Sequence, residues 1–94
     1  MSRPSLAPYL LGCAEFLTDY ADALDDQAAV RSGALRSAAS FARQTAAKLD
    51  RDLAHLEEFE GVSRAARTFL AESDSQDAGH ALAYALRMAA CAVG

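Results

Sequence analysis

The sequence has no tryptophan and no isoleucine among its 94 residues, and its three valines are scattered. Sheets are rich in β-branched and aromatic residues, so these absences exclude a fold built on β-strands. Both prolines, Pro4 and Pro8, lie near the N-terminus, so no proline interrupts a helix in the rest of the chain. Alanine, leucine and arginine are abundant instead, and these residues, like the glutamates that are also present, are strong helix formers. The composition therefore predicts an all-α protein.

The chain also lacks an excess of basic residues and a long apolar run. Its formal net charge is −4, with acids concentrated in residues 1–30 and 52–77 and bases in residues 31–51. An acidic chain does not favour binding to DNA, RNA or an anionic membrane, because neutralising phosphates requires clustered Lys and Arg. No segment reaches the ~18–20 apolar residues of a membrane span. We therefore expect no nucleic-acid partner and no membrane association, and a cytoplasmic location.

Cysteine is scarce as well, since only Cys13 and Cys91 occur. Their spacing matches neither a zinc site nor a redox CxxC motif, and neither histidine stands in a recognisable catalytic relation to them. Buried, reduced cysteine behaves as a small hydrophobic residue. We therefore predict no catalytic residue, no metal site and no bound cofactor.

Apolar residues at alternating spacings of three and four predict two long helices, at about residues 5–28 and 33–60. Ser32-Gly33 is the break between them. In an antiparallel hairpin, residues that face each other have a constant sum of their sequence numbers. Pairs such as Cys13 with Leu49 share a sum of 62, which predicts a hairpin in this register.

Charged residues obey the same register. Asp19 with Arg43 also has a sum of 62, and Glu15 with Lys48 has 63. This agreement between apolar and charged positions favours the hairpin, although an exposed ion pair contributes only ~0–1 kcal/mol.

Two shorter helices are predicted to follow. Gly61 interrupts the apolar pattern, and Ser63 can cap a short helix at about residues 63–72. A polar run then predicts a loop, and Asp77 can cap a C-terminal helix at about residues 77–93. We expect residues 1–94 to form one domain, a three- or four-helix bundle built around the hairpin.

The C-terminal helix is apolar nearly all round, which is typical of a central helix or of one shared with another chain. A domain of this size also has a thin core, so self-association is a reasonable expectation. Surplus apolar residues beside the predicted seams are the candidate interface. They are Tyr84, Met88, Cys91, Phe41 and Phe59.

An enzymatic alternative has to be weighed against this interface. Asp52-x-x-His55 and Asp77-x-x-His80 are similar to the Glu-x-x-His pairs that bind metals in four-helix bundles. The pairs Glu57-x-x-Glu60 and Asp74-x-x-Asp77 are faintly similar to the acidic pairs of small helical nucleotide pyrophosphatases. The Asp-x-x-His pairs depart from the known metal sites, because Asp is shorter than Glu and both histidines lie off the main apolar seam.

The function that we predict is a non-enzymatic protein–protein interaction module, such as an adaptor, small chaperone, immunity protein or inhibitor of bacterial or phage-like type. Its acidic faces suit a protein partner with a basic surface, and a homodimer is expected. The alternative is a small metal- or nucleotide-binding helical-bundle enzyme with Asp/His or Asp/Glu ligands. Convergence of His55 and His80 with carboxylates would favour that alternative.

Overall fold

The computed structural model describes residues 6–26, 31 and 33–93. These residues form four α-helices and one 3₁₀ turn, with no strand in the described part of the chain, so the predicted all-α bundle is confirmed. The elements are α1 (Ala7–Ala23), α3 (Ala34–Leu53), η1 (Glu57–Phe59), α4 (Glu60–Ala71) and α5 (Gln76–Val93).

Two helix ends differ from the prediction. Helix α1 ends at Ala23, earlier than residue 28, and residues 27–30 lie outside the described part of the chain. Helix α3 ends at Leu53, where the chain turns and Leu56 takes an extended conformation before η1 and α4 begin. The apolar spacing of Leu53, Leu56 and Phe59 continues across this turn, and neither Gly nor Pro marks it. Periodicity alone therefore predicts a helix that is too long.

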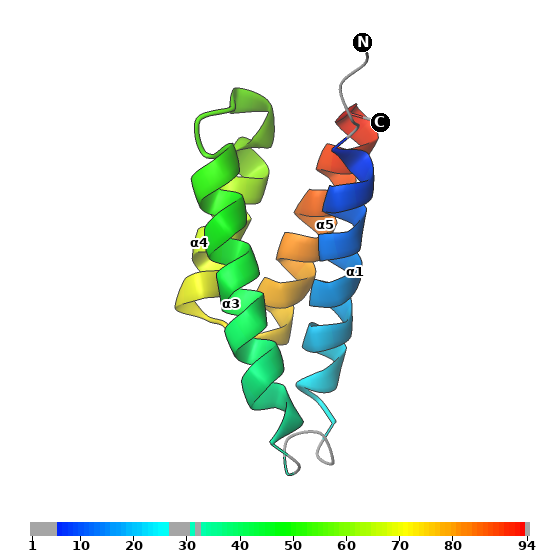
Figure 1. Cartoon of the computed structure of the whole chain (residues 1–94), viewed down its shortest axis with the longest axis vertical. Helices are drawn as coiled ribbons and strands as arrows, with labels where there is room; N and C mark the ends of the chain where they lie inside the picture. Colours follow the sequence, from blue (N-terminus) through cyan, green and yellow to red (C-terminus); the bar gives the residue numbers. More distant parts are fainter. Residues whose placement is uncertain (1–5, 27–30, 32, 94) are drawn as a thin grey trace.

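Successive helices run antiparallel and form two layers, α1 with α3 in front and α4 with α5 behind (Figure 1). Helix α1 packs most extensively against α5, and α3 packs most extensively against α4. Contacts between α1 and α3 are few by comparison. The hairpin of α1 and α3 is present, but its two helices are held together mainly through the rear layer.

The register of α1 against α3 also differs from the predicted one. The rings of Phe16 and Phe41 are in contact, and the ammonium group of Lys48 lies over the ring of Tyr9. Both pairs have a sequence-number sum of 57 rather than 62. At 1.5 Å per residue, this difference corresponds to a displacement of about 7 Å along the helix axes. The buried face of α1 turns toward α5 instead, with Ala14 and Ala21 inside.

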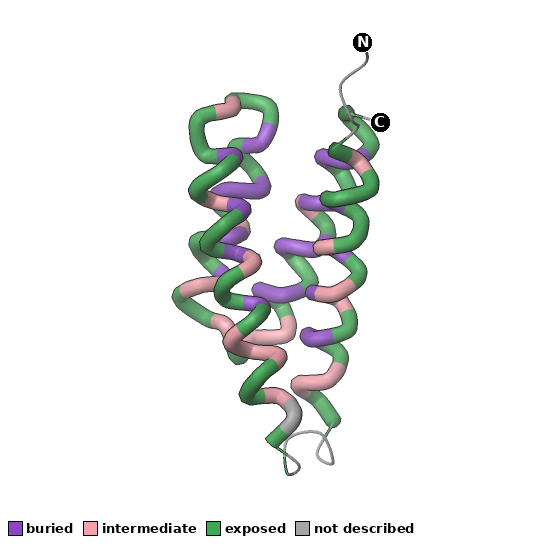
Figure 2. Tube along the Cα trace, in the orientation of Figure 1, coloured by how far each residue is buried: buried purple, intermediate pink, exposed green. Residues whose placement is uncertain are grey.

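The core lies between the two layers, where the buried stretches of all four helices face one another (Figure 2). The apolar spacing of α3 and the turn after it predicts a seam of Leu35, Ala38, Ala42, Thr45 or Ala46, Leu49, Leu53 and Leu56. Ala42, Ala46, Leu49 and Leu53 are buried as predicted, and Leu35, Ala38 and Leu56 are half-buried. Phe59, predicted for the interface, is only 2% exposed and belongs to this core. It is buried because the turn after α3 redirects it inward, so it cannot contribute to an exposed surface.

Helices α1 and α5 approach closely at Gly79. A Cβ atom added at this glycine would lie 2.9 Å from the Cβ of Ala21. Two hydrogen bonds hold the same end of α1 to the first residue of α5 and to the loop before it. The side-chain amide of Gln76 donates to the carbonyl of Ala21 at 2.9 Å, and the Tyr20 hydroxyl donates to the carbonyl of Ser73 at 2.9 Å.

A polar cluster links α3 to α4. The Ser63 hydroxyl donates a hydrogen bond to the Asp50 carboxylate, and the Nε of Arg67 lies 3.1 Å from the same carboxylate oxygen. The Nη2 group of Arg67 donates a hydrogen bond to the Ser63 hydroxyl at 3.2 Å. The hydrogen bond from Ser63, followed by the interaction with Arg67, lowers the pKa of Asp50 from its ordinary value of 3.8. This cluster therefore stabilises the ionised carboxylate in the folded state.

The lowered pKa makes stability depend on pH in a defined direction. As the pH falls below about 3.8, the unfolded chain binds a proton at Asp50 before the folded chain does, so the free energy of unfolding decreases. The Ser63→Ala variant lacks the hydrogen bond to Asp50, so it loses much of this pH-dependent contribution of Asp50 to stability. We expect the stability difference between wild type and Ser63→Ala to be larger at pH 7 than at about pH 2.5, as measured by urea denaturation. A difference that does not change with pH would contradict the assigned role of Ser63.

Candidate interaction surfaces

A groove of about 460 Å³ runs between α1 and α3 on the front layer, where these helices make few contacts. We call it the front groove. Its walls are mostly apolar, and Lys48 is the one charged residue that lines it within the described part of the chain. The lining residues are Pro8, Tyr9, Gly12, Cys13, Phe16, Phe41, Gln44, Thr45 and Lys48.

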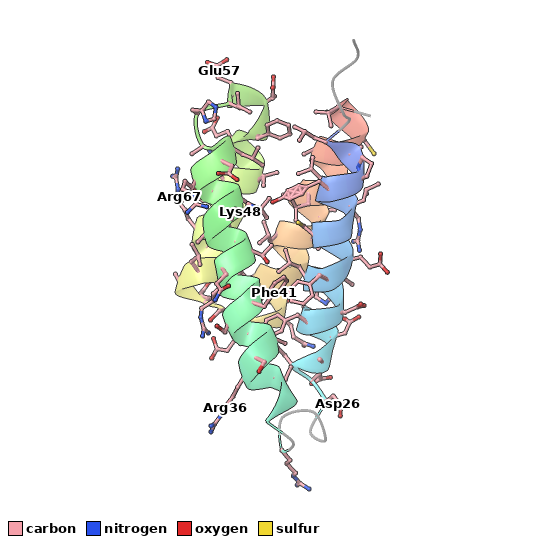
Figure 3. The ribbon with its side chains drawn as sticks, in the orientation of Figure 1. Asp26, Arg36, Phe41, Lys48, Glu57 and Arg67 are labelled. Carbon is pink, nitrogen blue, oxygen red and sulfur yellow. The ribbon has the colours of Figure 1, made fainter. Side chains whose placement is uncertain are left out.

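Aromatic contacts shape the front groove. The rings of Phe16 and Phe41 meet edge to face, with centroids 5.0 Å apart and an interplanar angle of 89°. Phe41 nevertheless remains 57% exposed and lies between α3 and α1 (Figure 3). The Lys48 ammonium lies 6.0 Å from the centroid of the Tyr9 ring, at the outer limit of a cation–π contact. The groove thus presents aromatic surface that this chain alone does not cover.

Cys13 lies in the front groove and is half-buried. Burial raises the pKa of its thiol, and this effect is opposed by a hydrogen bond with the Tyr9 hydroxyl and by the nearby charge of Lys48. A raised pKa keeps the thiol protonated near neutral pH, whereas the thiolate is the nucleophile. The environment of Cys13 therefore does not activate it for catalysis. Both cysteines are free, and Cys91 is exposed on α5.

A second hollow of about 290 Å³ lies between the start of α4 and the C-terminal half of α5. We call it the rear hollow. Tyr84 is 64% exposed and Met88 is 54% exposed along its edge, beside the exposed acid Glu58. The remaining lining residues are small or apolar, namely Gly61, Val62, Ala85, Ala89 and Ala92.

The five predicted interface residues are thus not one patch. Phe41 lies in the front groove, whereas Tyr84 and Met88 line the rear hollow. Cys91 is exposed on α5 but lines neither site, and Phe59 is in the core.

Apart from Phe41, the lining of the front groove was missed by the sequence prediction. The signal was present, because Tyr9 and Phe16 are seven residues apart on α1, and Phe41 and Lys48 are seven apart on α3. This spacing places each pair on one face of its helix, beside the main seam.

The candidate metal ligands do not converge. His55 lies in the turn before α4, and His80 follows the loop at the other end of α4. The Nε2 of His80 is 3.1 Å from a carboxylate oxygen of Asp22 on α1, so this imidazole already has a partner. Within residues 6–26, 31 and 33–93, no three His, Cys, Asp or Glu side chains are grouped in a way that could hold a metal ion.

No helix in the described part of the chain is both long enough and apolar enough to cross a membrane. Comparisons with protein-family models, with curated proteins and with solved structures found no match to this chain. The front groove and the rear hollow are therefore the features of this chain that point to a function.

Proposed function

We propose that this protein is a non-enzymatic protein–protein interaction module that uses its exposed apolar helix faces. The observation that supports this proposal is the position of three large apolar side chains. Phe41, Tyr84 and Met88 are each more than half exposed, and each borders a hollow rather than standing alone. Apolar surface gathered beside a depression is typical of interaction sites on small domains.

The rear hollow suits a partner that combines apolar and basic side chains. Tyr84 and Met88 supply the apolar contact, and Glu58 lies directly beside them. The neighbouring Glu57 is also exposed, at the same end of the bundle. An adaptor, small chaperone, immunity protein or inhibitor would use such a surface to bind a partner through apolar burial, with Lys or Arg of the partner opposite these acids.

An affinity-capture experiment with matched variants tests this function. Immobilised wild type should retain a protein other than this chain itself from cells that express the chain, and Met88→Asp should abolish the retention of that protein. The double variant Glu57→Lys, Glu58→Lys should weaken it at least tenfold, because it places positive charge beside the hollow. Salt should also weaken binding, since the acids are exposed.

Leu11→Asp is the matched control, because Leu11 is 48% exposed on α1 and lines neither the rear hollow nor the front groove. This variant should retain the same protein as the wild type. The proposed function fails if all four baits retain the same material, or if none of them retains any.

A further inference from the structure

We propose that the front groove is closed by a second copy of this chain, in a twofold-symmetric dimer in which α3 of each copy lies against α1 of the other. This inference rests on the proposed function, and it assigns the front layer to self-association while the rear hollow remains free for another partner.

The front layer has the size that such a dimer needs. The molecule measures 48 × 23 × 17 Å, and the α1–α3 layer forms one of its broad faces (Figure 1). The two longer dimensions give this face an area of roughly 1,000 Å², whereas a stable interface buries about 800 Å² per partner. Its centre is apolar, with Tyr9 39% exposed and Phe41 57% exposed.

The edges of this face carry opposite charges. Asp19 is seven residues beyond Gly12 and therefore lies near the groove, whereas Glu15 and Asp22, which are themselves seven residues apart, share a face that begins three residues beyond Gly12. The helical period therefore places Glu15 and Asp22 on the edge of α1 that is remote from α3. On α3, Arg36 points outward, away from α1, and Arg43 lies seven residues further along the same edge (Figure 3).

Symmetry brings these opposite charges together. Consider a twofold axis that lies in the front face and runs parallel to the helices. It sets α3 of one copy opposite α1 of the other copy, and each residue keeps its position along the helix direction, which we call its height. The contacts within one copy define which residues lie at the same height, because Phe16 is beside Phe41 and Tyr9 is beside Lys48. In this register, Arg43 of one copy lies within one residue of the height of Glu15 in the other copy. Arg36 likewise lies within one residue of the height of Asp22 in the other copy.

The other twofold axis within the face, perpendicular to the helices, sets α1 against α1 and places acids opposite acids. Like charges disfavour that arrangement. The charged side chains that pair across the proposed dimer can still make further hydrogen bonds. Within the described part of the chain, the side-chain hydrogen bond of Arg43 is to the Ser73 hydroxyl, at 3.5 Å, through one of its five N–H donors, and the contact of Asp22 with His80 leaves acceptor sites on the carboxylate.

The apolar centre fits the same arrangement. Phe41 of one copy lies at the height of Phe16 in the partner and faces the α1 wall of the partner's groove. Gly12 is in that wall, and a Cβ atom added there would meet nothing within 4 Å. The missing side chain leaves open space in which an aromatic ring can pack.

Sedimentation equilibrium or light scattering coupled to size exclusion tests the dimer. The wild type should be dimeric, and Phe41→Asp should weaken dimerisation at least tenfold with unchanged helical circular dichroism. Met88→Asp is the control on the rear face and should remain dimeric. A wild type that is monomeric throughout a micromolar to millimolar range would overturn the inference, as would a dimer that Met88→Asp dissociates and Phe41→Asp does not.

A charge-swap experiment tests the assigned symmetry. Glu15→Arg and Arg43→Glu should each weaken the homodimer, because each sets like charges opposite one another twice. An equimolar mixture of the two variants should form a heterodimer, since both of its contacts then join opposite charges. Failure of the mixture to dimerise better than either variant alone would overturn the twofold arrangement. Neither dimer experiment uses retention at the rear hollow, so the proposed function can fail or stand independently.

Discussion

Replacing Phe69 with Ala is expected to lower the free energy of unfolding by about 3–5 kcal/mol, the usual cost of removing a buried aromatic ring. Phe69 is fully buried, and its ring meets the ring of Tyr20 on α1 edge to face, with centroids 6.0 Å apart. One of its ring carbons also lies 3.8 Å from the position of a Cβ on Gly79 of α5. Phe69 thus joins α4 to both α1 and α5.

The size of this effect matters because single domains are only marginally stable, by about 5–15 kcal/mol. Urea denaturation followed by circular dichroism at constant protein concentration measures the change. Tyr84→Ala is the matched control, since it removes an aromatic ring that is 64% exposed, and it should cost less than about 1 kcal/mol. Equal losses for the two variants would mean that Phe69 does not hold the layers together.

Much of the rear layer could be predicted from the sequence. The apolar spacing of the short helix predicts that Val62, Ala66, Phe69 and Leu70 face inward; the first three are buried and Leu70 is half-buried. On the last helix, the spacing predicts one apolar face of Leu82, Leu86, Ala89 and Val93; the first three are buried, whereas Val93 at the end of the helix is exposed. Such predictions succeed because the period of an amphipathic helix depends only on its own residues.

The pairing of α1 could not be predicted in the same way. Helices α3 and α5 both run antiparallel to α1 and both present an apolar face, so periodicity does not decide which of them covers it. The deciding contact is the close approach of Ala21 to Gly79. Hydrophobic patterns give little weight to these small residues, although small side chains are what allow two helices to approach closely.

Exposure at the candidate surfaces also depends on neighbouring elements. Tyr84, Met88 and Phe41 are exposed as an interface requires, whereas Phe59 is turned into the core by the bend after Leu53. The apolar periodicity of one helix cannot predict a bend in the chain that follows it. The interface itself stays a prediction that the variants proposed above can test.

The crossing of α1 and α5 leads to the second large expected effect. Gly79→Leu is expected to destabilise the protein by about 3 kcal/mol, at the upper end of the usual cost of overpacking. Its first added atom alone would lie 2.9 Å from the Cβ of Ala21, and that neighbour is fixed to the α1 backbone, so the helices must separate. Leu is a better helix former than Gly by several tenths of a kcal/mol, so helix propensity acts in the opposite direction.

Two controls separate this steric effect from propensity. Gly12→Ala adds a Cβ to α1 that meets nothing within 4 Å in its own chain, and at a dilution at which the protein is monomeric it should raise stability by up to about 1 kcal/mol. The double variant Ala21→Gly, Gly79→Ala moves one methyl group from α1 to α5 and should stay within about 1 kcal/mol of the wild type. Thermal and urea denaturation of these variants give the comparison. If Gly79→Leu matched Gly12→Ala in stability, the close packing of α1 on α5 at this crossing would be wrong, and α1 would be free to pair with α3 in the register of 62.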